Sequence, residues 1–357
     1  MQRIAVMTGG GDAPGLNAAL RAVALAAHGR GWECLGVRAS FNGLLDNGGG
    51  GVVPLPPDAV QGIGHLGGTI LGTTNRADPF RWPPPGGRGE IDRSDDVLAA
   101  CARHGIEALV MIGGDGTLRI AAGLHRKGLP VVGVPKTIDG DVAGAGVTLG
   151  FASAVAFATE AIDRLHCSAQ SHRRVMVVEV MGRYAGWIAL HAGLAGGAHA
   201  ILLPEIPFDL AAVTRLLAER DARNRPDDIV VVAEGARPVR GQLFVADPAV
   251  PGRSERLGGV GAHVARQLEL LTGKESRAVV LGHLLRGGSP VAADRVAALR
   301  LGDAAVQALA EGRAGVMMTL NGDVPGAIPL EEVSTWRVPV DHPLLRTARS
   351  LGVCLGE

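Results

Sequence analysis

The chain has 357 residues and 35 basic and 35 acidic side chains, so its formal net charge is zero. This length predicts roughly two domains, and the zero charge removes the bulk attraction that favours nucleic acid as a partner. Only 3% of residues are aromatic, which disfavours base stacking. No apolar run reaches the ~18 residues of a membrane span. The four cysteines form no C-x-x-C pair, which favours a reducing, cytoplasmic setting over a zinc or disulfide framework.

Short apolar runs alternate with longer helix-like segments, among them Leu16–Ala27 and Phe151–Leu165. The runs are apolar on both faces, which is typical of buried parallel strands. They are Ile4–Met7, Ala108–Ile112, Val131–Val134, Val175–Val180, Ile201–Leu203, Ile229–Ala233, Ala278–Leu281 and Val316–Leu320. The alternation predicts a doubly wound α/β fold, in which ligands bind at the carboxyl ends of strands. Two segments rich in Pro and Gly, 80–90 and 238–256, are expected to be surface loops.

The first strand is followed by the glycine-rich segment Thr8-Gly-Gly-Gly-Asp-Ala-Pro-Gly15. Glycines let backbone N–H groups approach an anion, and the N-terminus of the following helix adds a favourable dipole. A tight turn without a ligand is the alternative interpretation, because such turns are common between strands and helices.

A second glycine loop, Ile112-Gly-Gly-Asp-Gly-Thr117, follows the next long apolar run. Its glycines leave room for phosphates, but the Asp115 carboxylate would repel them unless a cation intervened. Asp115 is therefore a candidate magnesium-binding group, with a simple turn or cap residue as the alternative. NAD kinases and lipid kinases share this motif, so alone it indicates a nucleotide phosphate and not a sugar.

The third motif, Pro135-Lys-Thr-Ile-Asp-Gly-Asp141, places two carboxylates beside a lysine and a hydroxyl. Asp139 or Asp141 could take the proton of an attacking sugar hydroxyl. Lys136, one of only three lysines in the chain, could neutralise charge on a transferring phosphoryl group. An Asx-turn with surface charges is the alternative.

Two further motifs place arginine or histidine where a strand becomes a loop. They are Glu179-Val-Met-Gly-Arg-Tyr-Ala-Gly186 and Ser276-Arg-Ala-Val-Val-Leu-Gly-His-Leu-Leu-Arg-Gly-Gly-Ser-Pro290. Arginine offers planar donors that match phosphate. A single arginine at a strand end is usually only solvent-exposed, but recurrence at several strand ends favours a site.

Together and in this order, the five motifs resemble the phosphofructokinase family, from Arg3 to about Asp294. The resemblance implies an α/β fold of two doubly wound three-layer domains with mostly parallel sheets. Residues 1–149 plus about 285–325 would bind ATP and Mg²⁺, and residues 150–284 plus about 326–357 would bind fructose 6-phosphate. It also implies a role in glycolysis and a homodimer or homotetramer with shared active sites.

The resemblance also implies a role for each matching residue. Asp139 would be the general base, supported by Asp141, and Thr137, Lys136 and Arg183 would complete the catalytic group. ATP phosphates would be held by Gly10, Gly113, Gly114, Gly116 and Thr117, with Asp115 on magnesium and Arg76 toward the γ-phosphate. The sugar phosphate would contact Met181, Gly182, Arg183, Glu234, His283 and Arg286, with Arg174 and Arg277 reaching across from a neighbouring subunit.

One position, Gly140, departs from the family pattern. Two others, Gly116 and Lys136, bear on whether the phosphoryl donor is ATP or pyrophosphate. Gly140 stands where the family usually has Asn, from which we expect local flexibility and no loss of chemistry. Members that use pyrophosphate usually have Asp where this chain has Gly116, and they have a Lys that matches Lys136. An Asp at position 116 would occupy and repel the α-phosphate region, so Gly116 favours ATP. Pyrophosphate is the alternative donor. A non-catalytic nucleotide-binding subunit is disfavoured because Asp115 and Asp139 are both present.

Overall fold

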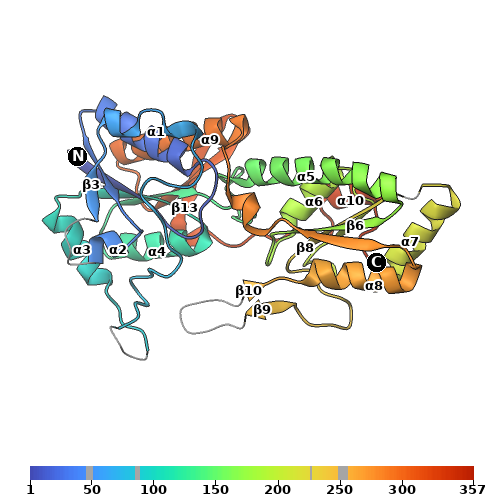
Figure 1. Ribbon diagram of the computed structural model, residues 1–357. Coiled ribbons are helices and arrows are strands. Elements are labelled where there is room, and N and C mark those ends of the chain that lie inside the picture. Colours follow the sequence, from blue (N-terminus) through green and yellow to red (C-terminus); the bar gives the residue numbers. More distant parts are fainter. Residues whose placement is uncertain (46–50, 85–88, 226, 248–255) are drawn as a thin grey trace. The chain divides into compact units, whose positions relative to one another are not determined.

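The computed structural model describes residues 1–45, 51–84, 89–225, 227–247 and 256–357, and it divides into two compact units (Figure 1). Unit 1 comprises Met1–Ile138, Val142–Ser153 and Arg286–Thr335. Unit 2 comprises Asp139–Asp141, Ala154–Leu285 and Trp336–Glu357. Within these residues, no helix is both long enough and apolar enough to span a membrane. The four cysteines are free thiols.

Unit 1 is built on a seven-stranded sheet with the order β13-β12-β5-β4-β1-β2-β3 among the described residues. Its interior strands pair in parallel, and β3 and β13 run antiparallel at the two ends. Its strands are β1 (Arg3–Thr8), β2 (Glu33–Val37), β3 (Val52–Pro54), β4 (Ala108–Gly113), β5 (Val131–Pro135), β12 (Val316–Asn321) and β13 (Val324–Pro329). Its helices are α1 (Leu16–Gly29), α2 (Asn42–Leu45), η1 (Pro57–Val60), η2 (Ile63–His65), α3 (Ser94–Arg103), α4 (Asp115–Arg126), α9 (Ala292–Ala310) and η4 (Leu330–Glu332).

Both faces of this sheet are covered by helices, which explains why its strands are apolar throughout. In β1, Ile4 and Val6 pack into a core with α1 and α9, while Ala5 and Met7 pack into the core on the α3 and α4 side. Successive side chains of a strand point to opposite faces. A strand between two helical layers must therefore be apolar at every position.

Among its described residues, unit 2 contains a four-stranded parallel sheet with the order β11-β6-β8-β7. Its strands are β6 (Val175–Val180), β7 (Ala200–Leu202), β8 (Asp228–Ala233) and β11 (Ser276–Val280). Its helices are α6 (Trp187–Ala195), α7 (Leu210–Ala222), α8 (Val260–Thr272) and α10 (Pro343–Ser350), together with most of α5 (Phe151–His172) and η3 (Gly282–Arg286). The strand β9 (Val245–Asp247) pairs with β10 (Arg256–Leu257). Figure 1 shows α5 and α6 on one face of the sheet and α8 on the other.

The predicted α/β class with two mostly parallel sheets is confirmed. Residues 326–335, which the sequence analysis grouped with the second domain, lie in unit 1 because β13 pairs along its whole length with β12. The segment 238–256 is not wholly a loop, since β9 and β10 form a short antiparallel pair there. Residues 85–88 and 248–255 of the two expected loops lie outside the described residues.

Candidate active site

Three of the predicted motifs meet at the carboxyl edge of the unit 1 sheet, where they follow the neighbouring strands β1, β4 and β5. The N–H of Gly9 donates to the carbonyl of Ile112 over 3.0 Å, and the N–H of Lys136 donates to the carbonyl of Gly113 over 2.9 Å. These bonds carry the strand pairing into the loops. The three loops that sequence reasoning singled out separately therefore form one surface.

Close packing around Thr117 explains two of the glycines. A Cβ at Gly113 would lie 2.4 Å from the Thr117 side chain, and one at Gly9 would lie 2.7 Å from its hydroxyl. Gly10 has a φ of +77°, a left-handed conformation that glycine adopts without strain. At Gly116, by contrast, a Cβ would meet nothing within 4 Å, so the space beside this residue is open.

Asp115 is the first residue of α4, at the end of the helix where a negative charge is favoured. Its carboxylate accepts a hydrogen bond from Arg119 Nη2 at 2.8 Å and from Thr335 Oγ1 at 3.2 Å. Neither donor belongs to one of the five sequence motifs. The i,i+4 spacing of Arg119 could have revealed it, whereas Thr335 is 220 residues away and carries no sequence signal.

The donor set around Asp115 fits magnesium held mainly by phosphate. The part of the chain that the structure describes holds no group of three or more His, Cys, Asp or Glu side chains arranged to bind a metal. Magnesium is usually bound by one or two carboxylates together with substrate phosphates and water. A single, partly exposed carboxylate beside a glycine loop meets that requirement.

Lys136 is buried, with 3% of its surface exposed, and its Nζ donates to the carbonyl of Gly11. A second segment joins the same loop: the N–H of Gly10 donates to Thr74 O at 3.0 Å, and Thr73 Oγ1 donates to Gly10 O at 2.8 Å. Two residues further along, Arg76 is exposed. The segment that carries Arg76 is thus tied to the first glycine loop.

The segment after β5 carries the candidate base. Thr137, Asp139 and Asp141 are each partly buried, and the Thr137 carbonyl accepts a hydrogen bond from Thr148 Oγ1 at 3.0 Å. Gly140 has a φ of +67°. Glycine and asparagine are the residues that enter this region most readily. Gly140 thus adopts a conformation that asparagine also tolerates, and the expected local flexibility stays a prediction.

In unit 2, the carboxyl edge of the sheet brings the fourth motif together with Glu234. The N–H of Glu234 donates to Val180 O at 2.9 Å, and the N–H of Gly235 donates to Gly182 O at 3.1 Å. Gly182 has a φ of +142°, and a Cβ there would lie 2.7 Å from the Ala185 carbonyl. Met181, Gly182, Arg183 and Glu234 therefore lie in adjacent loops at the ends of β6 and β8.

Glu179, at the start of the fourth motif, has a structural role. It is 3% exposed, and its carboxylate accepts from Gly261 N at 2.7 Å and from Gly259 N at 3.3 Å. It thereby satisfies backbone donors in the first turn of α8, which have no partner within the helix.

His283 and Arg286 lie three residues apart on η3, directly after β11. At that spacing, side chains of a 3₁₀ helix lie on one face. Arg286 Nη1 donates to the carbonyl of Asp12 at 3.1 Å, which attaches it to the glycine loop after β1.

Arg174 and Arg277 lie elsewhere, at the amino ends of β6 and β11. Arg277 pairs across the sheet with Met176, whereas Arg183 and His283 follow the carboxyl ends of the same strands. The six residues of β6 span roughly 20 Å at about 3.3 Å per residue. Within one chain, the structure therefore does not bring these two arginines to the predicted sugar-phosphate residues.

Glycine loops, a buried lysine and carboxylates at the carboxyl edge of a doubly wound sheet define a phosphate-binding protein of the α/β class. The family described as phosphofructokinase matches residues 3–309. The chain belongs to the phosphofructokinase family.

Its curated relatives carry two different names. The ATP-dependent 6-phosphofructokinase of Chloroflexus aggregans is 50% identical over 100% of this chain and 98% of that protein. The pyrophosphate--fructose 6-phosphate 1-phosphotransferase of Amycolatopsis methanolica is 49% identical over 90% of this chain and 91% of that protein. Among solved structures, phosphofructokinase from Saccharomyces cerevisiae is 31% identical with a TM-score of 0.78, covering 93% of this chain and 45% of that chain.

Proposed function

We propose that this protein is an ATP-dependent 6-phosphofructokinase, which transfers the γ-phosphoryl group of ATP to the 1-hydroxyl of fructose 6-phosphate in glycolysis. The main support for this proposal is that the loops after β1, β4 and β5 are hydrogen-bonded to one another. Asp115 and Lys136 lie on two of these loops. The relative named ATP-dependent 6-phosphofructokinase is 50% identical over 100% of this chain and 98% of that protein. The four free cysteines support a reducing, cytoplasmic setting.

In this proposal Asp139 accepts the proton of the attacking hydroxyl, which a base must remove during the transfer. Thr137 positions the substrate and Asp141 supports the base. Lys136 and Arg183 place positive charge near the phosphoryl group, where negative charge develops. Magnesium, when bound at Asp115, neutralises charge on the donor phosphates.

The same proposal assigns the donor phosphates and the sugar phosphate to different loops. Gly10, Gly113, Gly114, Gly116 and Thr117 hold the donor phosphates, with Arg76 toward the γ-phosphate. The sugar contacts Met181, Gly182 and Glu234. The adjacency of their loops at the ends of β6 and β8 supports this assignment, because one ligand can then reach all three residues. His283 and Arg286 bind the 6-phosphate from one face of η3.

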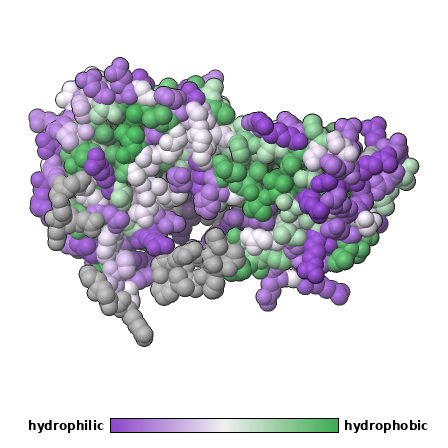
Figure 2. All heavy atoms as spheres, in the orientation of Figure 1, coloured by the Kyte–Doolittle hydropathy of each residue, from purple (hydrophilic) through white to green (hydrophobic). Residues whose placement is uncertain are grey.

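Arg174 and Arg277 complete the phosphate site of a second copy. Their position at the amino ends of the strands supports this sharing, because a single chain keeps them about one strand length from Arg183. Arg277 lies on β11, an edge strand of the sheet, and its side chain is 53% exposed. Val280 and Leu284 are also exposed, at 54% and 62%, and Figure 2 shows hydrophobic atoms over α5 and β11. An exposed apolar strand edge is a natural interface, so we propose a homodimer or homotetramer.

The relatives differ in the phosphoryl donor that their names give. The chain is about equally similar to a protein named for ATP and to one named for pyrophosphate. The open space at Gly116 supports ATP, because no side chain intrudes where an α-phosphate would lie. Lys136 is compatible with either donor, since it addresses the transferred phosphoryl group. The pyrophosphate-dependent activity is therefore the second candidate.

A donor comparison on the purified protein tests the proposal. Fructose 1,6-bisphosphate formation is measured with fructose 6-phosphate, magnesium and either ATP or pyrophosphate. We expect a kcat/KM for ATP at least about tenfold above that for pyrophosphate, which corresponds to about 1.4 kcal/mol. A preference for pyrophosphate would replace the first candidate with the second, and no product with either donor would refute both.

A further inference from the structure

Glu275 bridges the two arginines that lie at the amino edge of the unit 2 sheet. Its Oε1 lies 2.5 Å from Arg277 Nη2, and its Oε2 lies 3.3 Å from Arg174 Nη2. Each carboxylate oxygen thus serves one guanidinium group. No motif in the sequence marks Glu275 as functional, because its significance depends on β6 and β11 being neighbours.

Both guanidinium groups keep donors for a further anion. An arginine offers five N–H donors, and Arg277 otherwise donates from Nη1 to the Ser276 carbonyl at 3.1 Å. Arg174 is more enclosed, with 18% of its side chain exposed, and its buried Nε has no hydrogen-bond partner among the described residues. A buried donor without a partner is costly, so this pair of arginines is suited to a phosphate group.

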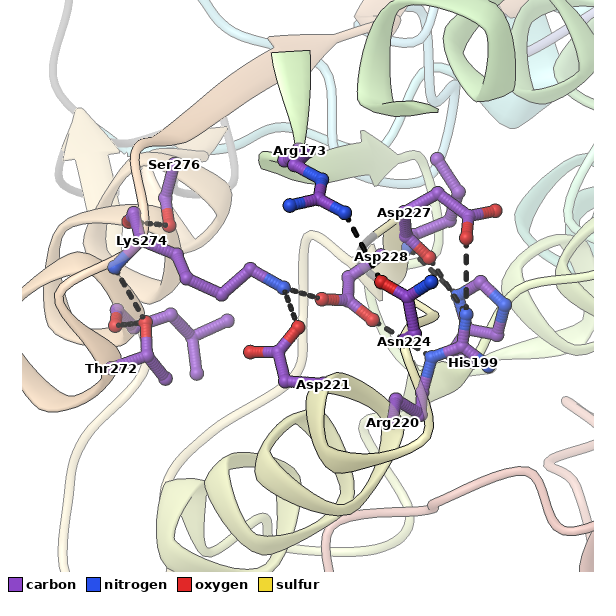
Figure 3. Close-up of polar contacts among 12 residues, drawn as sticks. Arg173, His199, Arg220, Asp221, Asn224, Asp227, Asp228, Thr272, Lys274 and Ser276 are labelled. Atoms are coloured by element: carbon purple, nitrogen blue, oxygen red, sulfur yellow. Dashed lines mark hydrogen bonds and ion pairs between the residues drawn. The ribbon is translucent and has the colours of Figure 1, made fainter. Parts of the chain in front are cut away.

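A partly buried cluster of ion pairs fixes the backbone next to Glu275. Lys274, adjacent to Glu275, donates to Asp228 Oδ2 at 2.5 Å and to Asp221 Oδ1 at 2.8 Å, and Arg220 Nε donates to Asp228 Oδ1 at 2.8 Å (Figure 3). Asp228 is fully buried. Breaking a buried charge pair is strongly unfavourable, so the strand start that carries Glu275 is firmly anchored.

The backbone connects the same cluster to Arg174. The N–H of Asp228 donates to Arg174 O at 3.4 Å, and the N–H of Val175 donates to Glu275 O at 3.0 Å. The segments that bear Arg174, Glu275 and Arg277 therefore share one rigid edge of the sheet.

We propose that Glu275 is a positioning residue for sugar-phosphate binding, which holds Arg174 and Arg277 side by side so that their remaining donors bind one phosphate monoester. The inference rests on the proposed function, since it assumes that these arginines bind the sugar phosphate. Without the carboxylate, two adjacent positive charges repel each other and their side chains regain rotamer freedom. Binding the phosphate must then restore the order that Glu275 supplies in advance.

The test compares steady-state kinetics of Glu275→Ala and Glu275→Gln with the wild type. We expect Glu275→Ala to raise the KM for fructose 6-phosphate about tenfold, while kcat and the KM for the nucleotide stay within about twofold. Glu275→Gln keeps the size and one acceptor oxygen, so its KM should lie between those of the wild type and the alanine variant. Glu311→Ala is the matched control, because Glu311 forms a similar ion pair with Arg313 at 2.5 Å, and its KM should not change.

Two further variants distinguish an error in the role of Glu275 from an error in the proposed function. Arg174→Ala and Arg277→Ala should raise the same KM by at least as much as Glu275→Ala. If they do and Glu275→Ala leaves the KM unchanged or lowers it, the positioning role is wrong and the proposed function stands. If Glu275→Ala and Glu275→Gln instead lower kcat, nucleotide binding and melting temperature together, the residue is structural. Wild-type protein that does not phosphorylate fructose 6-phosphate would refute the proposed function itself.

Discussion

The backbone N–H of Lys136 donates to the carbonyl of Gly113 over 2.9 Å, which joins the ends of β5 and β4. Neighbouring strands lie about 4.8 Å apart. The loop that carries Asp115 and the loop that carries Lys136 and Asp139 therefore begin one strand spacing apart. This relationship underlies the first three predictions.

Asp139→Asn should lower kcat at least about a hundredfold, since a positioned general base contributes roughly 10²–10⁴-fold. The asparagine has the same size, so the melting temperature should stay close to that of the wild type. Steady-state kinetics and thermal unfolding check both points. Asp323→Asn, which alters an exposed carboxylate paired with Arg300, is the control. Near-full kcat in the Asp139 variant would remove it as the base.

Asp115→Ala should reduce kcat much more than it changes the KM for fructose 6-phosphate, because the carboxylate acts on the metal and the donor phosphates. The magnesium concentration at half-maximal rate should also rise. A magnesium titration at saturating substrates measures this shift. Arg119→Ala, which removes one donor to the carboxylate, should have the smaller effect. Unchanged turnover at ordinary magnesium would exclude Asp115 from the site.

Gly116→Asp should damage the use of ATP more than any use of pyrophosphate. The new Cβ meets no atom within 4 Å, so the variant should fold, and its carboxylate would repel the α-phosphate that pyrophosphate lacks. The ratio of kcat/KM for the two donors gives the result, with Gly116→Ala as the uncharged control. Equal losses for both donors would mean that position 116 does not discriminate between them.

Mixed oligomers test whether the phosphate site is shared. Arg277→Ala and Asp139→Asn subunits are each expected to be impaired. Mixing them should restore part of the activity, because some sites would then combine an intact arginine with an intact base. Subunits with distinguishable tags show that mixed oligomers have formed. The absence of any recovery in proven mixed oligomers would indicate a site built within one chain.

Acid should destabilise unit 2 through His199. Burial, followed by the charge of Arg220, lowers the pKa of His199 to about 4 from the usual 6.5, although Asp228 and Asp227 act in the opposite direction. Its Nδ1 accepts a hydrogen bond from Ile229 N at 3.0 Å, which requires an unprotonated nitrogen.

The unfolded chain therefore binds a proton near pH 6.5 that the folded chain does not bind until about pH 4. Stability should fall as the pH is lowered through this window, by at most about 3 kcal/mol for a shift of roughly 2.5 pKa units at about 1.4 kcal/mol per unit. Melting temperatures measured across the window test the effect. His199→Asn, whose side-chain oxygen can accept the same N–H, should show a smaller loss, and an identical acid dependence in both proteins would contradict the prediction.

The apolar runs and the glycine loops were sufficient to predict the α/β class and the three loops of unit 1. Local pattern carries this information because a strand that is apolar on both faces, as in Ile4–Met7, can only be buried between two layers. The two helices predicted as examples begin at Leu16 and Phe151 as expected, but both end later than predicted. The helix that begins at Phe151 continues to His172, beyond the expected Leu165, because its last turns lack a proline or glycine to stop them.

Tertiary structure alone decided which chemical groups meet across the sequence. Thr335 reaches Asp115 from 220 residues away, and Glu275 joins Arg174 to Arg277 only because β11 pairs with β6. The sequence determined that Arg174 precedes β6 and that Arg277 lies at the start of β11, while the parallel pairing placed both at the edge opposite Arg183 and His283. Strand order and direction depend on packing between distant segments, and a local pattern of apolar residues does not encode them.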